Sequence, residues 1–284
     1  MADFVMHDAF DLLEPDGDAA PLIYDSPHSG TLYPDDFAHA VERLLLVGGE
    51  DRFVDDLVVD APRHGIALLR ALFARTYIDP NRDPTDLDPL LLPDDWPEAV
   101  EARLHSGRGI GLIFRLIGED RPIYDRRLGG AEIRHRIASY WEPYHQALQA
   151  RIDALHETYG AVWHVDWHSM QPVGNALSPD PGERRADFVL GDRFGQSCAP
   201  GFTACVADLL GDLGYTVAVN RPYAGAYIVE RQGRPAEGRH SLQIEINRGL
   251  YMDAGTLEAS PGMVPLRAAL GEFSRRLAEW TRRQ

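Results

Sequence analysis

The chain has 284 residues and a formal net charge of −16 at pH 7. Such an acidic balance disfavours nucleic-acid binding, which depends on basic side chains that neutralise phosphates. All 28 basic residues are arginine, and the absence of lysine excludes Schiff-base chemistry and a phosphate-binding P-loop. No apolar run is long enough to span a membrane, and the N-terminus lacks the pattern of a secretory signal, so we expect a cytoplasmic protein.

Apolar runs and helical spacings alternate along the chain. In chain order, the pattern predicts a strand at 21–25, helices at 35–47 and 51–64, strands at 66–70 and 76–79, a loop at 80–96, an ambiguous segment at 107–118, a helix at 130–159 bent near Pro143, a strand at 162–170, a loop at 171–185, a strand at 187–190, a helix at 202–213, strands at 215–219 and 241–246, and a helix at 263–283. This alternation is typical of an α/β layered sheet, and no composition shift divides residues 1–284, so we expect a single domain.

Two of the predicted strands end in the same way. Residues 22–29 and 162–169 are each an apolar run that leads through an aspartate, Asp25 or Asp166, to a His-Ser pair at His28 or His168. Because α/β enzymes place metal ligands and catalytic bases at strand ends, the two histidines suggest one shared site. The alternative is that each histidine is a hydrogen-bonded loop residue.

A metal site needs a third ligand, and a hydrolase needs a base. Glu50 and Asp51, at the start of a predicted helix, are candidate ligands. Glu245 lies between isoleucines on a predicted buried strand, where burial would raise its pKa toward the range of a general base. Strand periodicity also allows Glu245 to face solvent, so the pattern leaves its role open.

Several arginines follow predicted strands, where a guanidinium can bind a carboxylate through two parallel hydrogen bonds. Arg82 lies in a proline-stiffened turn, and Arg221 and Arg248 follow later strands. Each could equally form a structural salt bridge. Together they suggest a small anionic substrate.

Read in order, these segments resemble the N-formylglutamate amidohydrolase family. The matching segments are DSPHSG (25–30), EDRFVD (50–55), DPNRDP (79–84), DWHSM (166–170), NRPY (220–223) and QIEINRGLYM (243–252). They cover most of the chain, and they are specific as an ordered set although each is weak alone.

The resemblance implies a fold similar to that of zinc carboxypeptidases and aspartoacylases, a three-layer α/β sandwich with a mixed β-sheet flanked by helices. It implies that Zn²⁺ is bound by His28, His168 and an acidic residue, which we place at Asp51. The short motif by which some relatives take a carboxylate close to the first histidine is absent here, since Gly30 and Thr31 follow His28 instead.

The resemblance also implies the remaining roles. Glu245 matches the general base, and Asn81 with Arg82 matches the pair that binds the substrate carboxylate. Arg221 or Arg248 could bind a side-chain carboxylate, and Asp25 and Asp166 would orient ligands. The expected reaction is hydrolysis of an N-formyl or N-acyl amino acid, with a part in histidine degradation.

Other functions fit the same residues. A deacylase or small carboxypeptidase on this scaffold would differ mainly in its acyl pocket. A non-catalytic binding protein is disfavoured because His28, His168 and Glu245 occur together. A nucleotide-binding protein would need a phosphate loop or a Gly-x-Gly-x-x-Gly turn, and the sequence has neither.

Overall fold

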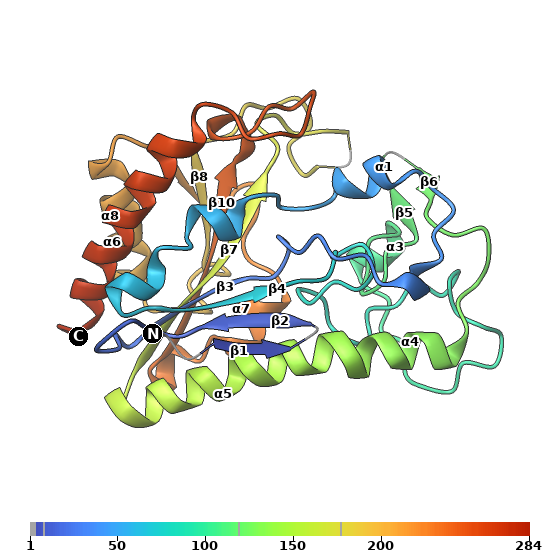
Figure 1. Ribbon diagram of the computed structural model, residues 1–284, viewed down its shortest axis with the longest axis horizontal. Coiled ribbons are helices and arrows are strands. Elements are labelled where there is room, and N and C mark those ends of the chain that lie inside the picture. Colours follow the sequence, from blue (N-terminus) through green and yellow to red (C-terminus); the bar gives the residue numbers. More distant parts are fainter. Residues whose placement is uncertain (1–3, 8, 119, 177) are drawn as a thin grey trace.

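The computed structural model describes residues 4–7, 9–118, 120–176 and 178–284. Eight strands form its main sheet (Figure 1). In spatial order they are β1 (Phe4–His7), β2 (Phe10–Leu13), β4 (Ala67–Ala71), β3 (Leu22–Ser26), β7 (Val162–Met170), β10 (Arg239–Asn247), β8 (Phe188–Gly191) and β9 (Val217–Val219). The four central strands from β4 to β10 run parallel, whereas β2 and β8 pair antiparallel with their inner neighbours.

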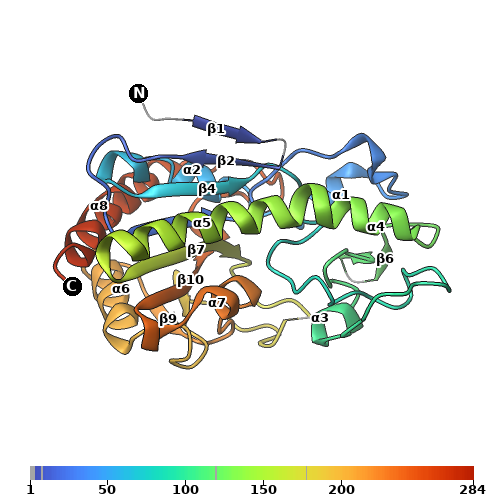
Figure 2. The ribbon, with the colours of Figure 1, turned by 90° about the horizontal axis from the view of Figure 1, so that it is seen from below.

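Helices cover both faces of this sheet (Figures 1 and 2). One face packs against α5 (Glu142–Tyr159), and the other against α2 (Val54–Leu57), α6 (Pro200–Asp212) and α8 (Met263–Thr281). This confirms the predicted three-layer α/β sandwich with a mixed sheet. No helix in the described part of the chain is long and apolar enough to cross a membrane.

Shorter elements lie mostly beyond one end of the sheet (Figure 1). They are the 3-10 helices η1 (Asp35–Phe37), η2 (Ala61–His64), η4 (Pro235–Glu237) and η5 (Arg248–Leu250), the π-helical segment η3 (Ile137–Trp141), the helices α1 (Arg43–Val47), α3 (Leu104–Gly107), α4 (Gly130–Arg136) and α7 (Tyr227–Gln232), and the small hairpin of β5 (Leu116–Ile117) and β6 (Arg121–Pro122).

The central strands carry different side chains on their two faces. On β7 and β10, alternate residues such as Trp167 and Ile244 belong to the apolar core under α6 and α8. The residues between them are polar, and register pairs them as His164 with Ser241, Asp166 with Gln243, and His168 with Glu245. These polar pairs are buried, so the polar face is internal and does not meet bulk solvent.

Two predicted helices are wrong as continuous elements. Residues 35–47 form η1 and α1, separated at Ala38, whose φ of 45° is left-handed, and Ala40 instead donates its backbone N–H to Ile123 O. Residues 51–64 form α2 and η2, because Phe53 also has positive φ and Pro62 cannot donate a helical hydrogen bond.

The predicted strand at 76–79 is also wrong, because Tyr77 N–H bonds back to Ala74 O in a turn. The long helix at 130–159 is confirmed, and its expected distortion near Pro143 is the π-helical turn η3 just before that proline. The pattern missed β1, β2 and α7, which are short.

Candidate metal centre

His28 and His168 meet at the carboxyl edge of the parallel strands. His168 lies near the end of β7, and His28 lies two residues beyond β3, the adjacent parallel strand. Asp51 precedes α2 and is held beside His28 by a 3.0 Å hydrogen bond from its backbone N–H to His28 O. The three side chains are buried and form one group of possible metal ligands.

The ligand atoms of this group are closely spaced. His28 Nδ1 lies 3.0 Å from His168 Nδ1, and Asp51 Oδ2 lies 3.3 Å from the first nitrogen and 3.2 Å from the second. Bonds of about 2.0–2.1 Å to a tetrahedral zinc ion would place its ligand atoms about 3.3 Å apart. The spacing therefore fits one zinc-sized cation.

The outer nitrogen of each imidazole faces a carboxylate. His28 Nε2 lies 2.7 Å from Asp79 Oδ1, and His168 Nε2 lies 2.7 Å from Asp166 Oδ1. If each Nε2 carries the proton that its carboxylate attracts, both Nδ1 lone pairs point toward Asp51 Oδ2. Three atoms with free lone pairs then converge with no hydrogen between them. This is the arrangement of ligand atoms that a cation requires.

The electrostatics of the cluster also favour positive charge. Burial raises the pKa of Asp51, but the neighbouring His168 and His28 outweigh burial and hold that pKa well below its usual value. Burial lowers the pKa of His168, but Asp166 and Asp51 outweigh this effect and hold it well above its usual value. The site thus stabilises an ionised carboxylate and an added positive charge.

The second oxygen of Asp51 is fixed by other side chains. Asp51 Oδ1 accepts hydrogen bonds from Arg248 Nη2 at 2.9 Å and from Ser169 Oγ at 3.1 Å. Arg248 also donates to Ser169 Oγ and to Glu50 O. The carboxylate of Glu50 accepts a hydrogen bond from the Tyr33 hydroxyl instead of joining the ligand group. Between the two predicted acids, the geometry favours Asp51 as the ligand.

Glu245 lies beside this group on β10. It pairs in register with His168, and its Oε1 accepts a 2.9 Å hydrogen bond from Gln243 Nε2. Burial raises the pKa of Glu245 to about 7, although His168 opposes the shift. A carboxylate with that pKa can both accept and return a proton near neutral pH.

Asn81 and Arg82 both lie at the site, in different environments. Asn81 Nδ2 lies 3.0 Å from His168 Nε2 and 3.4 Å from Asp166 Oδ2, and its Oδ1 accepts from Ile228 N–H at 2.8 Å. The amide of Asn81 therefore contacts His168, one of the three possible metal ligands. Arg82 donates from Nε and Nη1 to backbone oxygens, and its Nη2 lies 4.0 Å from Asp79 Oδ2.

The sequence reasoning missed the roles of Asp79 and Arg75. Asp79 Oδ1 faces His28, and Asp79 Oδ2 accepts two hydrogen bonds from Arg75, at 3.2 and 2.7 Å. Burial raises the pKa of Asp79, but Arg75 and His28 hold it well below its usual value. The sequence did contain a signal for Asp79, because this aspartate follows an apolar run as Asp25 and Asp166 do.

Asp25 lies deeper in the sheet than the sequence suggested. Its oxygens are held by His164 Nε2 at 2.8 Å and by the Tyr144 hydroxyl at 2.7 Å. His164 Nδ1 in turn lies 2.8 Å from Ser241 Oγ. The network joins three strands to α5, and the carboxylate that faces His28 is Asp79 rather than Asp25.

Arg221 lies apart from the metal cluster, in an exposed turn after β9. It lines a cavity of about 430 Å³ together with Arg184 and Arg185. Arg185 packs over the ring of Tyr223, 5.0 Å from its centroid, and Glu245 helps to raise the pKa of Tyr223 after the larger effect of burial. Glu245 itself is not among the residues that line this cavity.

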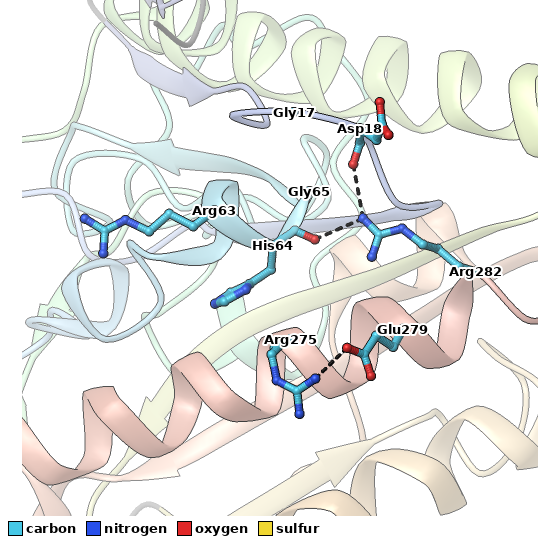
Figure 3. Close-up of a pocket in the computed structure, with 8 residues that line it drawn as sticks. All are labelled: Gly17, Asp18, Arg63, His64, Gly65, Arg275, Glu279 and Arg282. Atoms are coloured by element: carbon cyan, nitrogen blue, oxygen red, sulfur yellow. Dashed lines mark hydrogen bonds and ion pairs between the residues drawn. The ribbon is translucent and has the colours of Figure 1, made fainter.

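A second cavity, of about 250 Å³, is lined by none of these site residues (Figure 3). It lies between the Gly17–Asp18 turn, η2 and the C-terminal part of α8. Arg282 Nη2 donates to Asp18 O and His64 O across it, and Arg275 is paired with Glu272 and Glu279. Its cations are largely satisfied by protein partners.

Known proteins resemble this chain in sequence and in fold. The family model described as N-formylglutamate amidohydrolase matches residues 20–252. The crystal structure of N-formylglutamate amidohydrolase from Ralstonia eutropha JMP134 is similar, with a TM-score of 0.92 and 44% identity over 97% of this chain and 99% of that chain. No curated protein matches in the sequence search.

Two further solved structures are less similar. A gene product of Agrobacterium tumefaciens has a TM-score of 0.64 and 18% identity, over 96% of this chain and 95% of that chain, which supports the fold alone. A metallo-carboxypeptidase from Burkholderia cenocepacia has a TM-score of only 0.37 and 11% identity, over 97% of this chain and 64% of that chain.

Proposed function

Because the chain belongs to the N-formylglutamate amidohydrolase family and is an amidohydrolase, we propose that it hydrolyses the amide bond of N-formyl-L-glutamate or a closely related N-formyl or N-acyl amino acid in a zinc-dependent reaction. The observation that carries this proposal is the convergence of His28 Nδ1, His168 Nδ1 and Asp51 Oδ2 within 3.3 Å of one another, beside a glutamate with a raised pKa.

His28, Asp51 and His168 would hold the zinc ion. Zinc supplies a Lewis acid at this position, which polarises a carbonyl and makes water a stronger acid. Asp79 and Asp166 orient the two imidazoles, and Arg248 with Ser169 holds the far oxygen of Asp51. We assign Arg248 this positioning role in place of the substrate contact considered from sequence, because its donors bind protein atoms.

Glu245 acts as the general base and then as the general acid. Its carboxylate takes a proton from the attacking water, and the water oxygen bonds to the formyl carbon. The carbon–nitrogen bond then breaks, and Glu245 returns the proton to the leaving amine. The products are formate and the free amino acid. Gln243 keeps the carboxylate in place throughout.

Substrate recognition is assigned to arginines with different surroundings. Arg82 Nη2 is the one nitrogen of that guanidinium without a hydrogen bond of normal length to the described residues, and it would bind the α-carboxylate. Arg221, exposed at the cavity that it lines with Arg184 and Arg185, would meet a side-chain carboxylate. Asn81 supports this site through His168 rather than through substrate.

The test is formate release from N-formyl-L-glutamate by the zinc-loaded protein, compared with the same protein after chelation. We expect turnover with zinc, loss of turnover on chelation and recovery when zinc is restored. A panel of N-formyl and N-acetyl amino acids then defines the acyl group and side chain. Equal activity before and after complete metal removal would contradict the proposal.

A further inference from the structure

His105 is a histidine near the proposed site that none of the roles above uses. It lies on the short helix α3, outside the segments on which the family resemblance rests. The backbone N–H of Arg103 donates to Asp86 Oδ1, and the backbone N–H of Leu112 donates to Asp86 O. Both ends of the segment 103–112, which contains His105, are therefore bound to Asp86.

The same region is attached directly to Arg82. Arg82 Nε donates to Ile110 O at 3.2 Å, and Ile110 N–H donates to His105 O at 2.9 Å. Two hydrogen bonds therefore connect the backbone of His105 to the guanidinium proposed to bind the α-carboxylate. The position of His105 relative to Arg82 is fixed by the fold.

The imidazole of His105 has an unused polar atom. Its Nδ1 is buried and has no hydrogen-bond partner among the described residues. Buried polar atoms are nearly always paired, and an unpaired one costs free energy unless a ligand or water satisfies it. The charged groups that act on the ring are those of the site, namely Arg82, Asp79, Asp86 and Arg75.

The ring is also neutral. Burial, with Arg82 as the next largest cause, lowers the pKa of His105 to about 4. A neutral imidazole carries one N–H, and Nδ1–H would be a donor without a net charge. Arg82 has one nitrogen, Nη2, left for a ligand, whereas a carboxylate has two oxygens to satisfy.

We propose that His105 is a substrate-binding residue whose Nδ1–H and the Nη2 of Arg82 together hold the α-carboxylate of the N-acyl amino acid. This inference rests on the proposed function and adds a second donor to its carboxylate site. It explains why Nδ1 has no hydrogen-bond partner among the described residues.

Three substitutions of His105 separate a hydrogen bond from mere packing. Asn places its amide N–H close to the position of Nδ1, Gln places it nearer the position of Nε2, and Ala removes both. Each variant is assayed with N-formyl-glutamate and with the analogue whose α-carboxylate is a carboxamide. His135→Ala, at an exposed histidine on α4, is the control for loss of a histidine.

In His105→Ala and His105→Gln we expect kcat/KM for N-formyl-glutamate to fall about 10- to 100-fold, as for loss of a hydrogen bond to a charged group. The loss should be in KM, the carboxamide analogue should change less than about 3-fold, and His105→Asn should recover most of the affinity. Equal losses on both substrates, or no loss on either, would overturn the inference.

A binding measurement keeps this test separate from the proposed function. L-glutamate is titrated calorimetrically into each zinc-loaded variant, because the product carries the same α-carboxylate. Weaker glutamate binding in His105→Ala, restored in His105→Asn, supports carboxylate binding by His105 even if the wild type hydrolyses no N-formyl substrate. Unchanged glutamate affinity in His105→Ala contradicts it.

Discussion

The two faces of β7 and β10 differ in kind although both are buried. One face presents Trp167, Ile244 and their neighbours to α6 and α8, and it packs as an ordinary apolar core. The other presents three rows of polar side chains toward α5, ending in His168 and Glu245. Alternation along these strands therefore separates a core from an internal polar layer, rather than a core from solvent.

This difference explains which parts of the site were predictable. The histidines could be predicted because strand ends in α/β sheets meet at one edge. The side to which Glu245 points could not, because alternation is the same for a solvent face and a buried polar face. Only the neighbours on β7, brought together by register, show that this face is closed.

The fold was predictable where elements are long and regular, as in β7, β10 and α8. The fold was not predictable where the backbone conformation of a single residue interrupts an element. Ala38 and Phe53 have positive φ, which interrupts helices that the apolar spacing favours. The contact between Asp79 and His28 likewise depends on a turn 51 residues away in the chain. That residues 1–284 act as a single domain stays a prediction.

The largest expected effect that separates the polar face from the apolar face is on metal binding. His168→Ala removes one of the three converging ligand atoms, so we expect zinc to be lost from the purified protein. Zinc content per chain is measured by elemental analysis, with His135→Ala as the control that keeps its metal. Full zinc occupancy in His168→Ala would contradict the ligand assignment.

A substitution on the apolar face should lower the free energy of unfolding without affecting metal binding. Trp167→Ala removes a fully buried side chain next to His168, and we expect a loss of about 3–5 kcal/mol in the free energy of unfolding. Zinc stoichiometry of the folded fraction should stay unchanged. Denaturant unfolding and metal analysis check both parts, with Trp167→Phe as a milder control. Zinc loss from the folded variant would show that the two faces are not separable.

An intermediate effect is expected at Asp79. Asp79→Asn keeps the size of the side chain but weakens its hold on His28, so zinc affinity should fall about 10- to 100-fold. The affinity is measured by competition with a chelator. Asp153→Asn, which changes an exposed carboxylate paired with Arg239, should leave the affinity unaltered. An unchanged affinity in Asp79→Asn would remove this aspartate from the site.

The smallest expected effect is on pH dependence. Burial raises the pKa of Glu245 to about 7 in the metal-free chain, and a nearby cation lowers it from there. A base must be ionised, so kcat/KM should fall as pH drops through this pKa, with the acid limb at or below about pH 7. In the same range, folding stability contributed by protonated Glu245 is present at low pH and lost as pH rises through about 7. A rate that rises on acidification would contradict the assignment of Glu245 as base.

The most direct measurement is zinc content and turnover in Glu245→Gln, determined on the same preparation. Glutamine keeps the shape of the side chain but cannot take a proton, whereas His28, Asp51 and His168 are untouched. We predict full zinc occupancy and a kcat on N-formyl-L-glutamate lower by about 10²- to 10⁴-fold. Zinc retention with near-wild-type turnover would contradict the central claim.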